Sequence, residues 1–470
     1  MPTTSPADAL AQLWHLAGLD PASLGHATLT GAEPVVPSSF AVGTIAQASI
    51  AAAALAAAEI WLARTGRRQQ VAVDMTRAAH ECFGAFSVDG RVPEAWAKIS
   101  GLYPCGAKTA APGFVRFHAN FEHHRDGALR LLGLAPGPAT ERAAVEAALQ
   151  AWTAEDFEQA AADAGLVVAA ARTFAEWDAH PQAQALAGLP IMSIERIADA
   201  APRRLPPISG RRRPLDDVRV LELTRVLAGP IAGRTLAAYG ADVMLINSPH
   251  LPNIESIADT SRGKLSAHLD LKQADGRARL AHLIGDAHVF MQGYRPGGIA
   301  ALGFGPADVA RLRPGIVAVS LSAYGQAGPW AGRRGFDSIV QTATGLNAAE
   351  AEAFGSAEPR ALPMQVQDYA TGFLMAFGAQ AALLRQMREG GSWHVRVSLA
   401  QTGRWLRSLG RVDQGTTVAR PKFDGLLAEY PSGFGRLLAL PHAAEFSATP
   451  CGWVRPSMPP GSDAAEWPAP

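Results

Sequence analysis

The chain has 470 residues, which exceeds what one hydrophobic core usually holds, so two or more domains are expected. Lysine plus arginine and aspartate plus glutamate each total 42, so no net charge attracts nucleic acid or an anionic membrane. The three cysteines form no C-x-x-C pair, which argues against a disulfide framework and a zinc site. We therefore expect a cytoplasmic protein without a bound metal, whose partner is a small molecule or another protein.

Residues 1–90 form the first predicted segment, which contains a helix followed by a strand. The alanine-rich run 45–64 is apolar over a helical length, and residues 70–74 alternate as a strand does. The helix is apolar enough to raise a membrane span, but it contains Gln47 and Glu59 and a strand follows it closely. We therefore predict a helix buried in the protein. The N-terminus also lacks the basic and apolar stretches of a signal peptide.

Residues 91–210 form the second predicted segment, a small α+β domain that ends in a linker. The run 113–118 alternates like a strand, and amphipathic helices are expected at 143–152 and 154–164. The neighbours His123 and His124 suggest a metal site, but adjacent side chains point apart, so we interpret them as surface residues. The linker extends through 202–214, which holds four prolines and the cluster Arg211-Arg212-Arg213.

Residues 211–410 form the third predicted segment, in which strands and helices alternate. Strands are expected at 218–223, 242–246, 287–291 and 316–321, and the helices between them at 231–239 and 275–284. Such alternation predicts a parallel sheet with helices on both faces, a Rossmann-like α/β domain. The loop after the first strand lacks G-x-G-x-x-G, so a dinucleotide is not expected. Residues 411–470 form a C-terminal tail.

Asp368 is the candidate nucleophile, because it stands at the head of the long apolar run 373–384. A helix that begins just after Asp368 would point its free N–H groups and positive end at the carboxylate and keep it ionised near neutral pH. An ionised carboxylate can attack an activated acyl group. The alternative interpretation is an ordinary helix cap. We also expect Asp337 to hold Asp368 or to serve as a cap itself.

The segment that contains Asp368 has an echo near the N-terminus. Residues 42–79 match 366–403 without gaps, at pairs such as Val42/Val366, Gly66/Gly390 and Val73/Val397. Thr44 occupies the position of Asp368 in this echo. The chain therefore contains two related helix-strand units, of which only the second carries the carboxylate.

Several strings taken together resemble the family III CoA-transferases, the CaiB/BaiF group, over most of the chain. None of them is specific alone, but they follow one another in the family's order and spacing. They are residues 218–230, 239–243, 262–264, 269–272, 294–297, 302–303, 322–329 and 335–337. The resemblance implies the CaiB/BaiF fold, in which a Rossmann-like domain is joined to a smaller α+β domain.

The resemblance also implies a reaction, in which CoA moves from an acyl-CoA donor to a carboxylic acid through an aspartyl anhydride and an aspartyl-CoA thioester. Asp368 falls on the family's nucleophilic aspartate, and no permanently bound cofactor is implied. N–H groups of the turn after Asp368 are expected to stabilise the oxyanion. The residues that correspond to the family's CoA contacts are Arg225, Leu269, Asp270, Leu271, Lys272, Tyr294, Arg295, Arg334, Gly335, Phe336 and Asp337.

Three departures from the family pattern bear on function. Family members carry a basic-acidic pair where this chain has 244–249, so one phosphate anchor is missing. Leu227 replaces the glutamine of formyl-CoA transferases, and Phe336 replaces a histidine of the related racemases. The alternatives are a catalytically inactive binding or regulatory protein and, with less support, a racemase or lyase.

The order of the segments also departs from the family. Residues 40–201 resemble the nucleophile helix and small domain without the catalytic aspartate, and the nucleotide-binding half begins only afterwards. The chain thus resembles a rearranged tandem copy. A single site could be built by one chain or shared across a homodimer, which the family forms.

Overall fold

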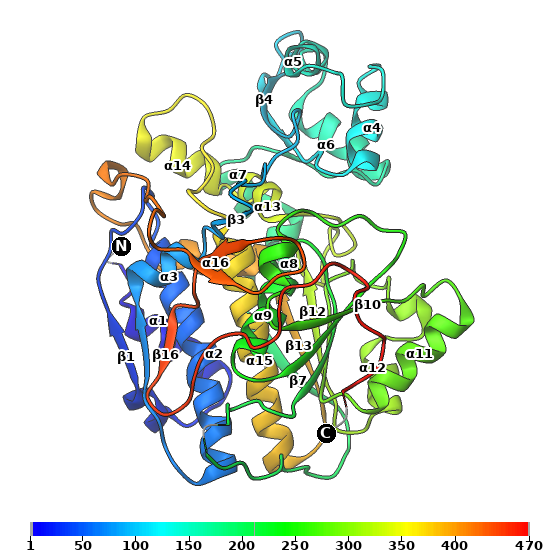
Figure 1. Ribbon diagram of the computed structural model, residues 1–470. Helices are drawn as coiled ribbons and strands as arrows, with labels where there is room; N and C mark the ends of the chain where they lie inside the picture. Colours follow the sequence, from blue (N-terminus) through cyan, green and yellow to red (C-terminus); the bar gives the residue numbers. More distant parts are fainter. Residues whose placement is uncertain (1–2, 211, 469–470) are drawn as a thin grey trace.

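The computed structural model describes residues 3–210 and 212–468, and its centre is a seven-stranded sheet (Figure 1). The strand order is β10-β9-β8-β11-β12-β13-β7, and every neighbouring pair is parallel except β13 with β7. The strands are β7 (Met192–Ala198), β8 (Arg219–Leu223), β9 (Asp242–Asn247), β10 (Lys264–His268), β11 (Val289–Gln292), β12 (Val317–Ser322) and β13 (Ser392–Ser398). The prediction of a Rossmann-like parallel sheet is confirmed.

Helices cover both faces of this sheet, because successive strand residues point to opposite sides. Val220 packs with α2 (Val42–Thr65), α9 (Ala228–Ala238) and α15 (Val366–Glu389) on one face. Its neighbour Leu221 packs on the other face. The helices of that other face are α11 (Ala274–Gly285) and α12 (Pro306–Leu312).

The long apolar helix α2 lies inside the protein, as predicted. It is long and apolar enough to cross a membrane, but 89% of its most apolar window is buried by other residues. It packs lengthwise against α15, and Gln380 of α15 donates a hydrogen bond to the Ala53 carbonyl at 3.0 Å. The echoed helices are therefore direct neighbours in space.

The echo extends to the strands beside the two helices. Strand β2 (Val71–Asp74) pairs in parallel with β1 (Ala27–Thr30), as β13 pairs in parallel with β12. The β1-β2 pair is completed by β16 (Ala444–Phe446) from the C-terminal tail. The N-terminal segment is thus a reduced second copy of the end of the large sheet.

The small domain projects from one end of the molecule (Figure 1). Its three-stranded sheet and three helices enclose a core of their own. These elements are β4 (Gly101–Cys105), β5 (Gly113–Phe117), β6 (Val168–Ala170), α4 (Glu122–Leu131), α5 (Arg142–Leu149) and α6 (Ala154–Asp163). These elements form a domain separate from the large sheet. The rest of the predicted segment 91–210 does not belong to that domain, because its strand β7 pairs with β13 in the large sheet.

The remaining elements connect these units. Arg64 of α2 donates to the carbonyls of Pro206 and Pro214 in the linker, whose Arg211 lies outside the described residues. The other helices and strands are α1 (Pro6–Leu16), α3 (Met75–Glu81), β3 (Phe86–Val88), α7 (Phe174–Ala179), α8 (Pro181–Ala187), α10 (Ile257–Thr260), α13 (Asp337–Ala343), α14 (Leu346–Phe354), α16 (Leu399–Ser408), β14 (Ala428–Tyr430) and β15 (Leu437–Ala439).

A buried ionic network joins the N-terminal segment, the large domain and the tail. Glu81 accepts from Arg234 at 3.0 Å, contacts Nδ1 of His442 at 3.0 Å and accepts from the Ala443 N–H at 2.9 Å. Arg234 also pairs with Asp259, which Arg262 holds from the other side. Burial alone would raise the pKa of Glu81, but the charges of His442 and Arg234 outweigh it and hold that pKa at about 2.

Replacing Glu81 with glutamine should lower the free energy of unfolding by about 3 kcal/mol at pH 7, because Arg234 is left without one of its buried acid partners. Equilibrium urea unfolding measures the change. Glu445→Gln is the matched control, since the Arg77–Glu445 pair is exposed and should contribute less than about 1 kcal/mol. Equal effects from both variants would contradict this role for the network.

The pKa of Glu81 sets a pH window for the same contribution. A depressed carboxyl pKa stabilises the folded state above the unfolded value of 4.5, and the contribution is lost as the pH falls toward 2. The difference between wild type and Glu81→Gln should therefore be constant from pH 7 to about 5 and shrink below that. Urea unfolding across this range tests the sign.

Candidate functional site

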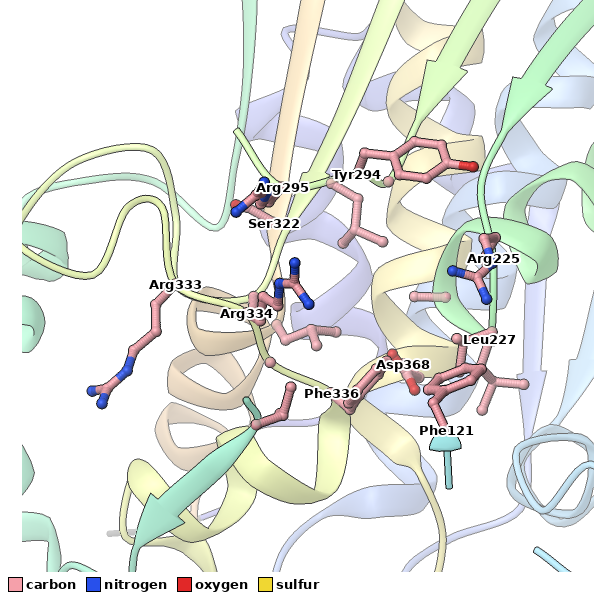
Figure 2. Close-up of a pocket in the computed structure, with 18 of the residues that line it drawn as sticks. Phe121, Arg225, Leu227, Tyr294, Arg295, Ser322, Arg333, Arg334, Phe336 and Asp368 are labelled. Atoms are coloured by element: carbon pink, nitrogen blue, oxygen red, sulfur yellow. The ribbon is translucent and has the colours of Figure 1, made fainter. Parts of the chain in front are cut away.

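A cavity of about 430 Å³ opens at the carboxyl ends of the parallel strands, between the large sheet and the small domain (Figure 2). Ligands bind at this edge of open α/β sheets. The wall is built by the loops after β8, β11 and β12, by the start of α15 and by the small domain. The lining includes Phe121, His123, His124, Arg225, Leu227, Ala228, Tyr294, Arg295, Arg333, Arg334, Gly335, Phe336 and Asp368.

Asp368 lies at the buried end of this cavity and is 7% exposed. Helix α15 begins at Val366, two residues before Asp368, so the aspartate is inside the first turn rather than ahead of it. The Asp368 N–H donates to Oδ2 of Asp337 at 2.9 Å. Asp337 therefore caps α15, and it lies next to Asp368 as predicted.

The structure opposes the expected ionisation of Asp368, because α15 begins before this residue and not after it. Burial raises the pKa of Asp368 well above its usual value, and the neighbouring carboxyl of Asp337 raises it further. Burial likewise raises the pKa of Asp337 to about 7, although the N–H groups of Asp368 and Gln367 donate to it. The N–H groups at the start of α15 stabilise the charged form of Asp337 and not that of Asp368. Asp368 therefore stays protonated to a higher pH than a free aspartate does.

Most of the predicted CoA contacts meet in the cavity. Arg225, Tyr294, Arg295, Arg334, Gly335 and Phe336 all line it, from three separate loops. Within residues 3–210 and 212–468, no carboxylate lies within 4.0 Å of the guanidinium groups of Arg225, Arg295 or Arg334. Arg333 differs from its neighbour, because it pairs with Glu158 at 3.7 Å and points away from the cavity in Figure 2.

The predicted stretch 269–272 lies outside the cavity lining and forms a turn after β10. Asp270 contacts Nε2 of His250 at 3.2 Å and accepts from the Lys272 N–H at 3.0 Å. Leu251, the residue after His250, does line the cavity. The cavity lining therefore does not include Leu269, Asp270, Leu271 or Lys272, which lie behind its open end, the rim. It does not include Asp337 either, which lies behind its buried end, the floor.

The small domain supplies lining residues that sequence reasoning missed. His124 is only 4% exposed and lines the cavity, so its interpretation as a surface residue is wrong. Its Nε2 lies 3.5 Å from Nη1 of Arg334. Phe121 joins it, and Arg225 lies over the Phe121 ring at 5.2 Å. Only the resemblance of residues 40–201 to the family's nucleophile helix and small domain pointed to this part of the chain.

Replacing Asp368 with asparagine should stabilise the protein at pH 8 by at least about 1 kcal/mol, since one unit of pKa shift corresponds to roughly 1.4 kcal/mol. The raised pKa means that stability falls as the pH rises above the unfolded value of 3.8, and the neutral amide escapes this penalty. The gain should shrink as the pH is lowered from 8 toward 4. Thermal unfolding at a series of pH values checks this, and a gain independent of pH would contradict the assignment.

Comparison with known proteins assigns a family to the region that contains the cavity. Residues 215–422 match the model of CoA-transferase family III. An acetyl-coenzyme A transferase from Hypoxylon pulicicidum is 36% identical, over 44% of this chain and 36% of its own length. A succinate–glutarate CoA-transferase from Agrobacterium fabrum is 35% identical, over 42% of this chain and 52% of its own length.

A solved structure of a hypothetical protein from Mycobacterium tuberculosis is 31% identical, over 42% of this chain and 58% of that chain, with a TM-score of 0.39. The chain spans about half the length or less of the two transferases named above, from Hypoxylon pulicicidum and Agrobacterium fabrum. The matched residues include β8 to α16, the arginines of the cavity and Asp368. Through this region, the chain is similar to CoA-transferase family III.

Proposed function

We propose that the protein moves CoA from an acyl-CoA to a carboxylic acid, with Asp368 as the nucleophile. The observation that carries the proposal is the Asp368 carboxylate itself. It lines the buried end of the cavity and makes no hydrogen bond or ion pair with another side chain of residues 3–210 and 212–468. A structural carboxylate at this depth is normally paired. An unpaired one is available to a ligand.

The reaction follows from this carboxylate. In its ionised form, Asp368 attacks the thioester carbon through a carboxylate oxygen, the C–S bond breaks, and a mixed anhydride and the CoA thiolate form. The thiolate then attacks the Asp368 carbonyl carbon, which releases the donor acid and leaves an aspartyl-CoA thioester. The acceptor carboxylate attacks that thioester to give a second anhydride and thiolate. Attack of the thiolate on the acceptor carbon forms the new acyl-CoA and restores Asp368.

The first turn of α9 is suited to stabilise the oxyanions of these steps. Gly372 lies one turn after Asp368 on α15, and a Cβ there would stand 2.5 Å from the Ala228 carbonyl, so the two helices approach closely. No side chain caps α9 at Leu227. We assign the oxyanion contact to the free N–H groups of the first turn of α9. The N–H groups after Asp368, which were expected in this role, form hydrogen bonds within α15.

Val226 adds support for this role of the turn. Its φ is +72°, a conformation that a β-branched residue rarely adopts, and it lies in the cavity wall just before α9. Such strain collects at functional sites, where the surrounding structure enforces it. Here it turns the chain from β8 into α9 at the floor of the cavity.

The arginines of the cavity are suited to the phosphates of CoA. Arg225, Arg295 and Arg334 carry charges that no carboxylate within 4.0 Å neutralises in the described part of the chain, and Tyr294 offers a ring beside them. Guanidinium groups bind phosphate oxygens through paired hydrogen bonds. Residues 269–272 complete this proposal as a second layer behind the rim.

The nucleophile is tested by covalent adducts. Incubation with an acyl-CoA followed by borohydride should convert Asp368 to homoserine, because the aspartyl thioester is reduced to an alcohol. Peptide mass spectrometry should find this change in wild type and lose it in Asp368→Asn. Glu122→Gln, which removes an exposed carboxylate next to Phe121, is the control and should keep the modification. Bound CoA without any modification would favour the inactive binding protein.

The CoA contacts are tested by a pair of neighbouring variants. Arg334→Met should weaken CoA binding roughly 10- to 100-fold, the effect of losing a charge-assisted contact to phosphate. Arg333→Met should leave the Kd for CoA unchanged, because the Arg333 guanidinium is paired with Glu158 and points away from the cavity. Isothermal titration calorimetry measures both. Equal losses from the two variants would remove Arg334 from the proposed contacts.

A further inference from the structure

A buried ion pair lies behind the first turn of α9. Nζ of Lys264 in β10 lies 2.7 Å from Oε2 of Glu222 in β8, and neither side chain has any exposed surface. Moving two charges out of water is costly, and their attraction offsets this cost only in good geometry. Neither residue lines the cavity, and the proposed reaction uses neither of them. Such a pair is better explained by a position that it fixes than by the stability that it adds.

Both members of the pair hold the chain around the start of α9. The ammonium group of Lys264 donates to the Pro230 carbonyl at 2.8 Å, inside the first turn. Glu222 accepts through its other oxygen from Oγ1 of Thr224 at 2.5 Å, in the loop that leads from β8 to α9. Hydrogen bonds to charged groups are stronger than those between neutral groups. The ion pair therefore anchors both the loop and the turn.

The helix lies so close to these groups that only glycine fits at two of its positions. A Cβ on Gly229 would stand 2.3 Å from the Cβ of Thr224, and a Cβ on Gly233 would collide with the carboxylate of Glu222. Neither glycine has a φ in the left-handed region, so the close approach requires them and not the backbone conformation. The first turn is therefore seated directly on the anchored groups.

The first turn of α9 has two N–H groups that the helix itself cannot use, those of Ala228 and Gly229. Pro230 has no N–H, and the Ile231 N–H donates to the Leu227 carbonyl at 2.9 Å. The first N–H groups of a helix have no acceptor within it. Ala228 lines the cavity. The oxyanion contact thus depends on two adjacent groups whose position the buried ion pair sets.

We propose that Glu222, Lys264 and Thr224 are positioning residues for the oxyanion contact, and that they act through the first turn of α9. This inference rests on the proposed function, because it concerns the step in which negative charge forms on the thioester oxygen. Groups that perform chemistry must be held to within about 0.5 Å of the productive geometry. The ion pair therefore contributes to the rate of the chemical step and not to the binding of CoA.

The test uses the double variant Glu222→Gln with Lys264→Met, which removes both charges together and leaves no partner charge buried alone. It also removes the hydrogen bond to the Pro230 carbonyl. The rate constant of Asp368 modification by saturating acetyl-CoA or succinyl-CoA should fall about tenfold or more, since losing one oxyanion donor outright costs roughly a hundredfold. The Kd for CoA, measured by calorimetry, should stay unchanged, because the oxyanion exists only in the chemical step.

Two single variants separate position from stability. Thr224→Val keeps the packing on Gly229 and loses the hydrogen bond to Glu222, so the rate constant should fall by roughly threefold or more with an unchanged Kd. Glu81→Gln is the control, because it removes a buried carboxylate that holds Arg234, beyond the first turn of α9. It should keep the wild-type rate constant although it lowers stability.

The outcomes distinguish this inference from the proposed function. A wild-type rate constant in the double variant, or an equal loss in Glu81→Gln, would overturn the inference and leave the proposed function standing. No modification of the wild type by either acyl-CoA would overturn both. Urea unfolding shows whether the double variant folds, and if it does not, a wild-type rate constant in Thr224→Val would overturn the inference.

Discussion

The packing of α15 between α2 and α9 is the constraint on which the rest of the structure depends. α15 is buried along nearly its whole length, so its register against the two neighbours fixes where its first turn lies. Gly372 lets α9 approach closely enough for both first turns to meet at the cavity floor. A carboxyl group held there by apolar packing loses solvation and is flanked by Asp337, which together explain its raised pKa. The same burial that positions Asp368 therefore also restrains its ionisation, a conflict often found at sites that perform chemistry.

The two halves of the chain are related, but only one keeps the acidic pair. At the start of α15, Asp337 accepts from the Asp368 N–H, and at the start of α2, Glu33 accepts from the Thr44 N–H at 2.8 Å. The first copy thus has a capping carboxylate of its own and a threonine at the nucleophile position. Its small domain supplies Phe121, His123 and His124 to the cavity that holds Asp368 in the second copy. A homodimer remains a proposal.

Sequence reasoning reached the sheet, the buried helix and the position of Asp368 because these follow from local patterns. Neighbouring apolar residues such as Val220 and Leu221, which face opposite sides of the strand, indicate a sheet that is covered on both faces. The family strings place the loops at its carboxyl edge. It failed where a property depends on contacts distant in sequence. The ionisation of Asp368 is set by Asp337 and by burial, His124 is buried only because the small domain folds over the cavity, and β7 joins the large sheet as its antiparallel edge. None of these follows from spacing or composition.

We propose that one chain builds the whole site, with Phe121 and His124 from its first half and Asp368 from its second. The most direct measurement is the rate at which a saturating acyl-CoA modifies Asp368 over a wide range of protein concentration. Native mass spectrometry follows the oligomeric state in parallel. A rate constant independent of concentration, and a modified monomer, are the predicted results. A rate that falls on dilution as a dimer dissociates would show that a second chain completes the site and would contradict a site built by one chain.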